Sequence, residues 1–597
     1  MPPSEEYAQR RSSRESRVTH YEKIHIRLGN IRLVLAILAA IMAWAGFRSH
    51  ALSPWWLAAP VAAFVGIASY HTQILRAREL AQRAVSYYEK SLARVEDRWA
   101  GSGETGGRFD DPHHVYAGDL DLFGIGSLFQ LLSTARTRMG EDTLAQWLLS
   151  PSSVDKIRER HAAVDELRGQ IDLREDLAVL GEDVGVGVHP DALSKWAESP
   201  NQMKPLWLQW LAPIMAALAV LAAAVWAYWG VATPLLVVVV VEAIFTYKLK
   251  APLEEVLHGT EHAFRDLDLL SEVLARVEAH TFQAPRLLAL QQELLSSGVP
   301  ASQAIAQLRT LVDRINSRHN IFIRIIDVPL MYSVQVAFAA ERWRLAHGSS
   351  LRSWVATVGQ MEAFLSLATY SFEHPADPFP EFVEGAASLA AKEIGHPLVP
   401  ATSCVRNDVA ISGDTKVLLI SGSNMSGKST LMRAIGMNVV LAMAGAPVRA
   451  RRLQLTPLQV GASIRVNDSL REGSSRFYAE ITRLRQIVDL ADGDLAGSNP
   501  PLLFLLDELL QGTNSKDRRI GAEGIVRALV KRGAIGLVST HDLALTDIGG
   551  SVEGRLRNVH FQDELANGKM TFDYKLRDGV VTKSNGLELM RSIGLEV

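Results

Sequence analysis

The chain has 597 residues, enough for about three or four domains. Its formal net charge is −3, which excludes an overall basic character, so any contact with nucleic acid would depend on local patches. Its single cysteine, Cys404, excludes a disulfide framework and a cysteine-built zinc site and fits a reducing compartment.

Two uncharged stretches near the N-terminus predict a membrane hairpin. A polar, basic-leaning segment covers 1–32, and apolar runs then cover 33–47 and 51–70. The first run is short for a span, which needs about 20 residues, but flanking Arg32 and Arg48 can lengthen it by snorkelling. A buried hairpin inside a soluble domain is the alternative. Basic residues flank the pair of runs on both outer sides, which predicts that both ends of the hairpin (33–70) face the cytoplasm.

Soluble helices are predicted on both sides of a second apolar stretch. Residues 71–107 form a charged amphipathic segment that ends in a glycine-rich linker, GSGETGG. Between 108 and 203 apolar residues recur at a spacing of three to four, which is typical of helices. The same pattern returns over 250–385, where a leucine-rich stripe is interpreted as core packing. We therefore expect one helical core that the second apolar stretch interrupts.

The interrupting stretch, 204–249, is the stronger membrane signal. Residues 205–241 carry no charged side chain, and Gly230 to Pro234 divides them into two spans. Tryptophans near both ends and lysines outside them predict a second hairpin with the same cytoplasmic orientation. Glu242 lies within the last apolar run, where a carboxylate is a candidate for a functional role in the membrane. Because it is near the cytoplasmic end, we expect it rather to snorkel or to face another helix.

The last unit, 386–597, alternates apolar strands with helices, which predicts an α/β nucleotide-binding domain. A strand predicted at 417–420 leads into the pattern G-x-x-x-x-G-K-S, and a helical run starts at Thr430. Glycines let backbone N–H groups turn toward phosphate oxygens, Lys428 can reach the β- and γ-phosphates, and the Ser429 hydroxyl can ligate Mg²⁺. A chance match in a glycine-rich loop is the alternative, and the flanking strand and helix argue against it.

Two further strand ends complete the predicted site. An apolar strand that starts at Pro501 leads into Asp507, which can hold Mg²⁺, and Glu508, which can orient and deprotonate an attacking water. A second strand, 535–540, ends at His541, whose imidazole can contact the terminal phosphate or the same water. The predicted catalytic residues are Glu508 and His541, and the predicted metal ligands are Ser429 and Asp507.

These segments resemble motifs of the MutS mismatch-repair ATPase family. The resemblance covers the loop SGSNMSGKST, the segment DELLQGTNSKDR and the segment STHDLALT. It also covers DSLREGSSRFYAEI (468–481) and KSNGLELMRSIGL (583–595). Upstream, SLFQLLSTARTRMGEDTLAQWLLSP (127–151) is similar to the helical core of that family. The order of the five ATPase motifs is the family's order.

The resemblance implies the fold and the composition of the site. The expected fold is multidomain: an all-α MutS-type helical core interrupted by transmembrane helical hairpins, followed by a C-terminal α/β P-loop (ABC-like) ATPase domain. A homodimer with two composite sites for ATP and Mg²⁺ is implied, in which Ser475 reaches the γ-phosphate held by the other subunit. The implied nucleotide-binding residues are Gly422, Ser423, Asn424, Met425, Ser426, Gly427, Lys428, Ser429, Thr430 and Ser475.

Three departures from the family bear on function. A membrane hairpin stands where the family has its mismatch-reading N-terminal domain, and the second hairpin leaves little room for a DNA clamp at the tips of the helical levers. The chain has Cys404 or Val405 where the family has an adenine-stacking aromatic residue. The chain ends at Val597, soon after the ATPase motifs, and no nuclease appendage is expected.

The expected function is a membrane-anchored ATPase that binds DNA, in mismatch repair or in another role that depends on DNA structure. The alternatives are an ATP-driven membrane scaffold acting on a protein partner and a transporter-type ATPase. Against the transporter, no LSGGQ-like segment precedes the strand that ends at Asp507. The expected location is the cytoplasmic (inner) membrane, crossed several times, with the ATPase domain facing the cytoplasm.

Overall fold

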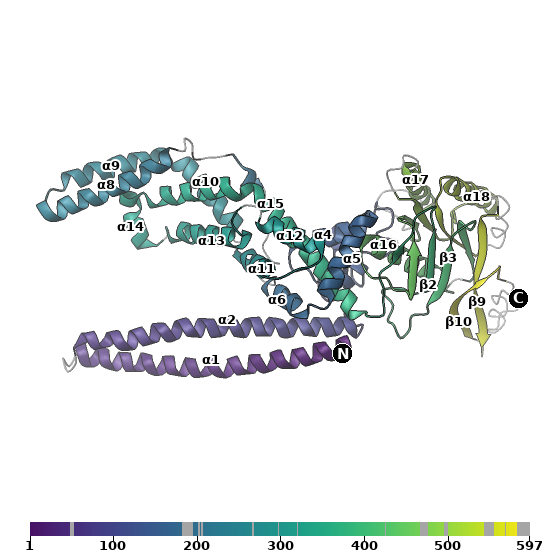
Figure 1. Cartoon of the computed structure of the whole chain (residues 1–597), viewed down its shortest axis with the longest axis horizontal. Helices are drawn as coiled ribbons and strands as arrows, with labels where there is room; N and C mark the ends of the chain where they lie inside the picture. The colour runs from purple at the N-terminus through teal and green to yellow at the C-terminus, as the bar shows by residue number, and fades with distance from the viewer. Residues whose placement is uncertain are drawn as a thin grey trace.

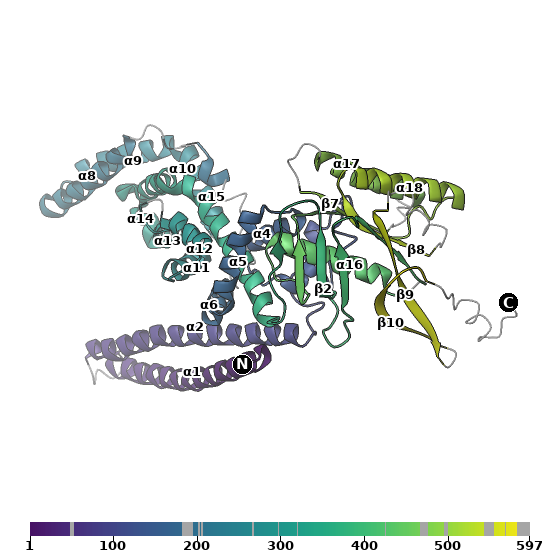
Figure 2. The ribbon, with the colours of Figure 1, turned by 45° about the vertical axis from the view of Figure 1, so that its right-hand side comes forward.

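The computed structural model describes residues 1–47, 53–181, 195–200, 203, 207–264, 268–295, 298–318, 320–423, 425–465, 476–494, 500–541, 554–566 and 569–581. Within these residues the molecule is drawn out along one axis (Figure 1). An α/β region lies at one end, and the tips of two helical hairpins lie at the other end in both views (Figures 1 and 2). The prediction of a helix-rich multidomain chain with an α/β region near the C-terminus is confirmed.

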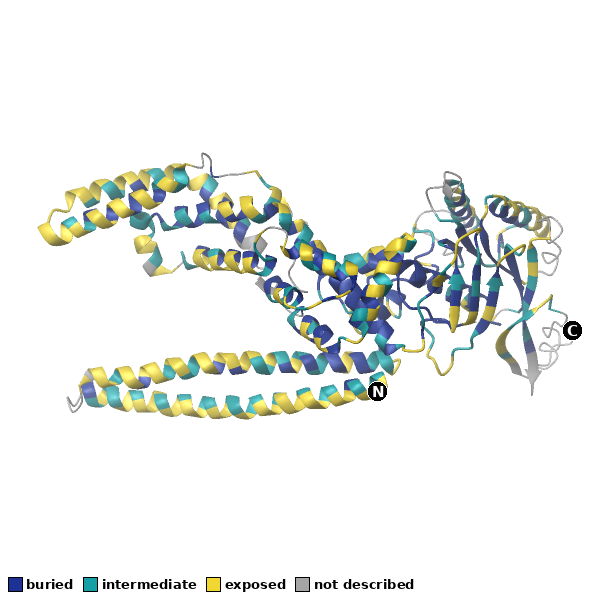
Figure 3. Ribbon diagram, viewed as in Figure 1, coloured by how far each residue is buried: buried dark blue, intermediate teal, exposed yellow. Residues whose placement is uncertain are grey.

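The first hairpin consists of two long helices, α1 (Pro3–Phe47) and α2 (Ala58–Val95), with a short turn of helix, η1 (Pro54–Leu57), before α2. The sequence predicts a separate tail over 1–32, but most of it belongs to the same helix as the apolar run that follows. Ion pairs four residues apart, such as Glu6–Arg10, support this polar part of the helix. Much of the surface of both helices is exposed (Figure 3).

The second hairpin is formed by α8 (Leu208–Trp229) and α9 (Thr233–Lys248). Gly230 ends α8 in the left-handed region (φ +72°), which glycine adopts without strain. Glu242 is the buried residue of α9, and neither oxygen of its carboxyl group has a hydrogen-bond partner. The Glu242 side chain is fully buried, which agrees with a helix-facing position.

Two of the described helices are long and apolar enough to cross a membrane: residues 3–46 within α1, and α8. The bent pair of α14 (Ile321–Leu330) and α15 (Tyr332–Glu373) would add a third if it formed one span. The second arm of each hairpin does not meet the same criterion, and α9 has only 16 residues. By length and composition each hairpin therefore has one candidate span, and the four-span arrangement stays a prediction.

The helical core comes from chain on both sides of the second hairpin. Its first part is α3 (Leu128–Leu132), α4 (Arg138–Leu149), α5 (Val154–Arg168) and α6 (Ile171–Gly181). Its second part is α10 (Lys250–Phe264), α11 (Asp268–Glu278), α12 (Pro285–Leu295), α13 (Ala301–Ser317), α14 and α15. Helix α15 packs against α4, α5, α12 and α13. It runs from the second hairpin to the α/β region (Figure 1).

The α/β region contains two sheets. The larger has the strand order β10-β9-β4-β8-β7-β6, and only its pairing of β10 with β9 is antiparallel. Its strands are β4 (Val417–Ser421), β6 (Gln459–Ser463), β7 (Leu502–Leu506), β8 (Ile535–Thr540), β9 (Leu556–Ala566) and β10 (Lys569–Asp578). The smaller sheet has the order β1-β5-β2-β3. Its strands are β1 (Glu381–Phe382), β2 (Leu389–Ile394), β3 (Asn407–Ile411) and β5 (Arg452–Leu455).

The helices of the α/β region are α16 (Lys428–Ala444), α17 (Arg476–Asp494) and α18 (Ser515–Lys531). Helix α16 is buried along almost its whole length because it contacts β6 and β8 on one side and α4 and α5 on the other. A Cβ at Gly436 would come within 2.7 Å of both Leu120 and Leu505. One continuous buried cluster therefore joins the α/β region to the helical core.

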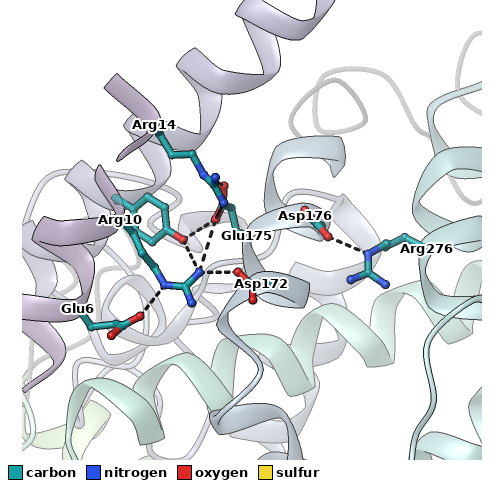
Figure 4. Close-up of polar contacts among 8 residues, drawn as sticks. Glu6, Arg10, Arg14, Asp172, Glu175, Asp176 and Arg276 are labelled. Carbon is teal, nitrogen blue, oxygen red and sulfur yellow. Dashed lines mark hydrogen bonds and ion pairs between the residues drawn. The ribbon is translucent and has the colours of Figure 1, made fainter. Parts of the chain in front are cut away.

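A polar cluster fastens the first hairpin to the helical core (Figure 4). Arg14 of α1 donates two hydrogen bonds to the carboxylate of Glu175 in α6, at 2.6 and 2.9 Å. The Tyr88 hydroxyl of α2 donates to the same carboxylate at 2.5 Å, and Arg10 pairs with Asp172 at 2.5 Å. Bidentate arginine–carboxylate pairs are strong and directional, so the cluster holds both helices of the hairpin against α6.

Candidate functional site

The predicted phosphate-binding loop connects β4, in the interior of the large sheet, to the start of α16. Two glycines allow its shape. Gly422 (φ +154°) and Gly427 (φ +102°) have backbone angles that residues with a side chain rarely adopt. A Cβ at Gly422 would lie 2.9 Å from the Ser426 hydroxyl, and one at Gly427 would lie 3.1 Å from the Tyr574 ring. The loop is thus folded tightly at the N-terminus of a helix, a place that favours anions.

Lys428 is buried at the bottom of this loop. Its ammonium group donates to the carbonyl oxygens of Gly422 (2.9 Å) and Ser423 (2.8 Å). Burial lowers the pKa of Lys428, and the nearby carboxylates of Glu508 and Asp507 act in the opposite direction. The hydroxyl groups of Ser423 and Ser426 are buried without a hydrogen-bond partner. A buried cation held by neutral carbonyls, beside two unpartnered hydroxyls, fits an anionic ligand such as a phosphate group.

Asp507 follows β7 and connects three elements. Its carboxylate accepts a hydrogen bond from the Ser429 hydroxyl of α16 at 2.5 Å and another from the Ser539 hydroxyl of β8. The described residues contain no group of three or more His, Cys, Asp or Glu side chains that could hold a metal ion. Ser429 and Asp507 supply oxygen ligands only, the type that Mg²⁺ prefers, and Mg²⁺ usually completes its shell with phosphate oxygens and water. The donor set therefore fits Mg²⁺ held jointly with a phosphate ligand.

Glu508 has a positive φ of +48°, so its side chain leaves the chain in a direction different from that of Asp507. Its carboxylate lies 3.3 Å from Nδ1 of His541 and accepts a hydrogen bond from the Gln511 side-chain amide. Its backbone N–H donates to the Ser539 hydroxyl at 3.1 Å. Ser539 thus contacts both acidic residues and sets their relative positions.

The segment after Glu508 is held by the start of α17. The carboxylate of Glu480 accepts from the Leu510 backbone N–H at 2.5 Å. A Cβ at Gly512 would lie 2.8 Å from Cβ of Phe477, so only glycine fits this contact. Helix α17 begins one residue after Ser475, and through Phe477 and Glu480 it contacts the segment that follows Glu508.

A cavity of about 660 Å³ opens beside the loop. Its lining includes Lys428, Ser429, Asp507 and Glu508, together with residues that lie far from them in the sequence. On its walls are Ile394, Gly395, His396, Val399, Ser403, Cys404, Val405, Asn407, Phe561 and Tyr574. This size suits a nucleotide, because pockets for small molecules and cofactors typically enclose about 300–1,000 Å³.

Tyr574 is held over the cavity by an irregular part of β10. The pairing of β10 with β9 shifts between Phe572 and Leu576, and Tyr574 has a positive φ of +53°. The Asn407 side chain supports this irregularity by donating to the Tyr574 carbonyl (3.0 Å) and accepting from the Leu576 N–H (2.8 Å). The cavity therefore has an aromatic ring and Cys404 in its lining.

Most of the predicted site residues meet at this cavity. Gly427, Lys428, Ser429, Asp507 and Glu508 lie together there, and His541 joins them through Glu508. Met425 and Thr430 also line the cavity, although both residues are exposed to solvent. Asn424 and Ser475 lie outside the described residues.

Several residues that complete the site were not predicted from the sequence. They are Ser539, Gln511, Asn407 and Tyr574. Ser539 begins the STHDLALT segment, whose resemblance to a family motif was recognised in the sequence. Its contacts with Asp507 and Glu508 could not be predicted from that motif. Nothing in the local sequence of β10 marks Tyr574, whose position depends on a strand irregularity and on a side chain 167 residues away.

Comparison with known proteins identifies both parts of this arrangement. A family model described as MutS domain V matches residues 418–596, and one described as MutS domain III matches residues 118–186. The chain is 32% identical over 257 residues to a DNA mismatch repair protein MutS from Shouchella clausii, covering 42% of this chain and 28% of that protein. It is 33% identical over 208 residues to an Endonuclease MutS2 from Thermus thermophilus, covering 34% of this chain and 25% of that protein.

A third relative is the DNA mismatch repair protein MSH3 from Phaeosphaeria nodorum, 32% identical over 250 residues, which are 40% of this chain and 22% of that protein. The chain thus spans less than a third of the length of each of these curated relatives. Residues 187–417 lie between the two matched family models, and they include the second hairpin and α15.

Proposed function

We propose, on the premise that this chain is a MutS-family protein, that it binds ATP with Mg²⁺ and hydrolyses it. The observation that carries the proposal is the convergence of Lys428, Ser429, Asp507 and Glu508 on one cavity, with two unpartnered serine hydroxyls in the adjoining loop. Chain segments about eighty residues apart supply these groups, and each has the chemistry that phosphoryl transfer requires. ATP turnover by the purified full-length protein tests the proposal.

Each residue has a distinct part in the proposed reaction. Lys428 neutralises the terminal phosphates, and the loop N–H groups orient them. Glu508 accepts a proton from the attacking water, while Gln511 and His541 hold its carboxylate in position. Ser429 and Asp507 hold Mg²⁺, which supplies neutralisation of charge on the phosphate oxygens when it is bound.

Tyr574 is proposed to stack on the base of the nucleotide. Its ring lies next to Gly427 of the phosphate-binding loop, and Cys404 and Val405 also line the cavity. Neither Cys404 nor Val405 has an aromatic ring that could stack on the base. In this proposal Tyr574 of β10 supplies the ring instead. A planar ring against a base contributes about 1–3 kcal/mol in comparable contacts.

A homodimer with composite sites is proposed from the family resemblance. In it, Ser475 reaches the nucleotide of the other subunit, and Asn424 belongs to the phosphate-binding loop. The packing of Phe477 and Glu480 against the segment after Glu508 supports a link between that signature loop and the catalytic carboxylate. ATP turnover that rises more steeply than protein concentration would support the dimer.

Membrane anchoring through both hairpins, 33–70 and 204–249, is proposed as well. The two hairpins project toward the same end of the molecule, away from the α/β region, so one bilayer can hold both tips (Figures 1 and 2). Large apolar side chains on these tips are exposed, among them Trp44, Leu218 and Val237. The ATPase unit, 386–597, then faces the cytoplasm, as the basic flanks of the hairpins predict.

The membrane proposal is tested by extraction of membranes with alkaline carbonate. Full-length protein is expected to stay in the pellet, because apolar helices of this length remain in the bilayer. Recovery in the soluble fraction would contradict anchoring and would leave the ATPase proposal untouched.

The proposed role of ATP turnover is in DNA repair or in another process that depends on DNA structure. Support comes from the relatives, which are named as mismatch repair proteins and as an endonuclease. One observation favours the alternative, an ATP-driven switch that acts on a membrane protein partner. The α8–α9 hairpin occupies the end of α15 far from the α/β region, where the family is expected to carry its DNA clamp (Figure 1).

DNA binding by the detergent-solubilised protein separates these two roles. Matched, mismatched and branched duplexes are compared at several stated salt concentrations, because phosphate contacts make affinity depend on salt. Preference for one duplex, altered by ATP, supports the DNA role. Absence of binding to all three supports the protein-partner role.

A further inference from the structure

Helix α14 is apolar, and yet the structure does not bury it. Its sequence is IFIRIIDVPL, and none of its side chains that the structure describes is buried. Ile321 and Ile325 are each 69% exposed, and Ile326 is 38% exposed. The preceding helix, α13, shows the ordinary behaviour of a core helix, with a buried stripe that includes Leu308 and Val312. A short apolar helix with no buried stripe is unusual for a helical core and indicates a missing apolar partner.

The orientation of α14 is built into the chain. The axis of α14 is bent by 75° from that of α15, and Met331 between them takes a positive φ of +47°. Met331 is nonetheless almost fully buried, so the bend is packed in place. The Asp327 carboxylate accepts hydrogen bonds from the backbone N–H and the hydroxyl of Ser333, at 2.8 and 2.9 Å, and so caps the start of α15. The exposed face of α14 is therefore held in a fixed direction.

Helix α14 lies beside the second hairpin. It contacts both α8 and α9, and in both views it lies on the side of them that faces the first hairpin (Figures 1 and 2). Met331 belongs to the same buried cluster as Ala212 and Met215 of α8, which places the end of α14 at the level of the first turns of α8. At that level α8 exposes Trp210, and α9 ends with the exposed Tyr247. Exposed aromatic residues at the ends of apolar helices are typical of the membrane–water interface.

The bend of 75° argues against one straight membrane span across α14 and α15. Ten residues of helix extend about 15 Å, half of the hydrocarbon thickness of a bilayer. The first turns of α15 cannot continue such a span, because Val334 and Ala337 are fully buried against protein. A lipid contact in the plane of the membrane therefore fits the length of α14 better than a span does.

We propose that α14 is an interfacial helix, which lies in the cytoplasmic surface of the bilayer with Ile321, Ile325 and Ile326 among the lipid chains. Arg324 is exposed at the edge of this apolar face, where its guanidinium can reach lipid phosphates while its aliphatic stem stays in the interface. The inference rests on the proposed membrane anchoring. It adds a third membrane contact, directly joined to α15, the helix that leads to the ATPase unit.

The contact makes α15 a link between the nucleotide site and the lipid surface. The last residue of α15 lies at the entrance to the α/β region, and its first residue follows the bend after α14. A rotation of α15 during the ATPase cycle would change the tilt or depth of α14 in the interface.

Depth-dependent fluorescence quenching tests the proposal. Single cysteines replace Ile325 of α14, Val237 of α9 and Leu345 of α15 in the full-length Cys404→Ser protein. Each cysteine carries an environment-sensitive fluorophore, and the protein is placed in vesicles of phosphatidylcholine and phosphatidylglycerol. All three positions are exposed, at 69%, 58% and 53%, so the labels should not disturb packing. The loss of fluorescence of each label is measured with two quenchers, one attached to the lipid chains and the other iodide dissolved in the water.

The labels at Ile325 and Val237 are expected to lose roughly half of their fluorescence or more to the lipid quencher, and the label at Leu345 only to iodide. If the Val237 label is quenched by lipid but the Ile325 label responds like Leu345, the interfacial helix is refuted while anchoring stands. If neither label is quenched by lipid, anchoring itself fails. Protection of the Ile325 label from both quenchers would mean that protein, such as a second copy of the chain, covers α14, and would also overturn the proposal.

Discussion

Arg94 of α2 and Glu373 of α15 form a buried ion pair, in which Nη2 of Arg94 lies 2.7 Å from Oε1 of Glu373. The side chains are 11% and 1% exposed, and the Tyr7 hydroxyl of α1 donates to the same carboxylate at 3.3 Å. Four residues later, Asp377 pairs with Arg449 of the α/β region at 3.3 Å. The first hairpin is thus attached at the junction between α15 and the α/β region, so a change at this junction acts directly on the hairpin.

Removal of Arg94 should loosen the first hairpin. Arg94→Ala leaves the Glu373 carboxylate buried without its cation, which costs about 3–5 kcal/mol for a pair of this kind. Hydrogen exchange of α1 and α2, measured by mass spectrometry, should become faster. Arg98→Ala is the control, because its exposed pair with Glu96 contributes at most about 1 kcal/mol. Equal exchange in the two variants would show that the buried pair does not hold the hairpin.

Replacement of the loop lysine should abolish ATP turnover. Lys428→Ala removes the buried cation that neutralises the terminal phosphates, and we expect a loss of at least about 100-fold in rate. Phosphate release by the detergent-solubilised full-length protein measures it. Lys531→Ala, at the exposed end of α18, is the matched control and should keep the parent rate. Full turnover by Lys428→Ala would refute the site.

Replacement of Glu508 should impair ATP hydrolysis without impairing ATP binding. Glu508→Gln keeps the shape of the side chain and its contact with Gln511 but cannot accept the proton from water. We expect ATP to bind normally and the rate to fall by about 10²–10⁴-fold, the usual contribution of a general base. Rapid-quench measurement should find unhydrolysed ATP on the protein. A loss of ATP binding equal to the loss of rate would contradict the role as base.

Tyr574 should determine the affinity for the base of the nucleotide. Tyr574→Ala removes an aromatic surface that contributes about 1–3 kcal/mol when it stacks on a base, so ATP should bind roughly 5- to 160-fold more weakly. Tyr574→Phe keeps the ring and should bind like the parent. Equilibrium titration with a fluorescent ATP analogue measures both. If the two variants lose the same affinity, the ring does not stack on the base.

The stability of the helical core should depend on pH through Glu362. Burial raises the pKa of Glu362 to about 7 from an ordinary 4.5, although hydrogen bonds from Thr137 and from the Arg136 N–H act the other way. The folded protein therefore binds this proton more tightly than the unfolded chain does. The contribution of Glu362 to the free energy of unfolding is complete below about pH 4.5 and is lost as pH rises through about 7. The stability lost over this pH range is on the order of 3 kcal/mol.

Urea denaturation should show this dependence when it is followed by tryptophan fluorescence, to which the core residues Trp147 and Trp354 contribute. The urea concentration at the midpoint of unfolding of the parent protein should decrease as the pH is raised from about 6 to about 8.5. Glu362→Gln, which cannot titrate, should reduce that fall, and Glu523→Gln, in a partly exposed ion pair with Arg527 on α18, should not. An unchanged pH dependence in Glu362→Gln would assign the effect to another group.

The same glutamate shows why part of the helical core was recognisable in the sequence. Thr137 caps α4 by accepting from the Gly140 N–H at 3.1 Å, and it also donates to Glu362 of α15. A Cβ at Gly140 would collide with Glu362. Thr137 and Gly140 both lie in the segment 127–151, whose resemblance to the family was recognised in the sequence. Glu362, which contacts both of them, lies 225 residues after Thr137.

Local sequence patterns were enough to predict the chemistry of the proposed nucleotide site and the existence of the hairpins. Both depend on consecutive residues: a phosphate-binding loop is a short run of glycines, lysine and serine between a strand and a helix, and an apolar hairpin is a long uncharged run. Lys428, Ser429, Asp507 and Glu508 were found for this reason, and the structure brings them to one cavity.

Only the tertiary structure decided what surrounds these local features. Tyr574 reaches the cavity through an irregular strand, and Glu373 meets Arg94 across 279 positions of the chain. Helix α14 reads in sequence like any core helix, and only its packing shows that Ile321 and Ile325 stay exposed while the helix contacts α8 and α9. Local patterns record which residues are apolar or reactive, whereas burial and pairing depend on which distant segments the fold brings together.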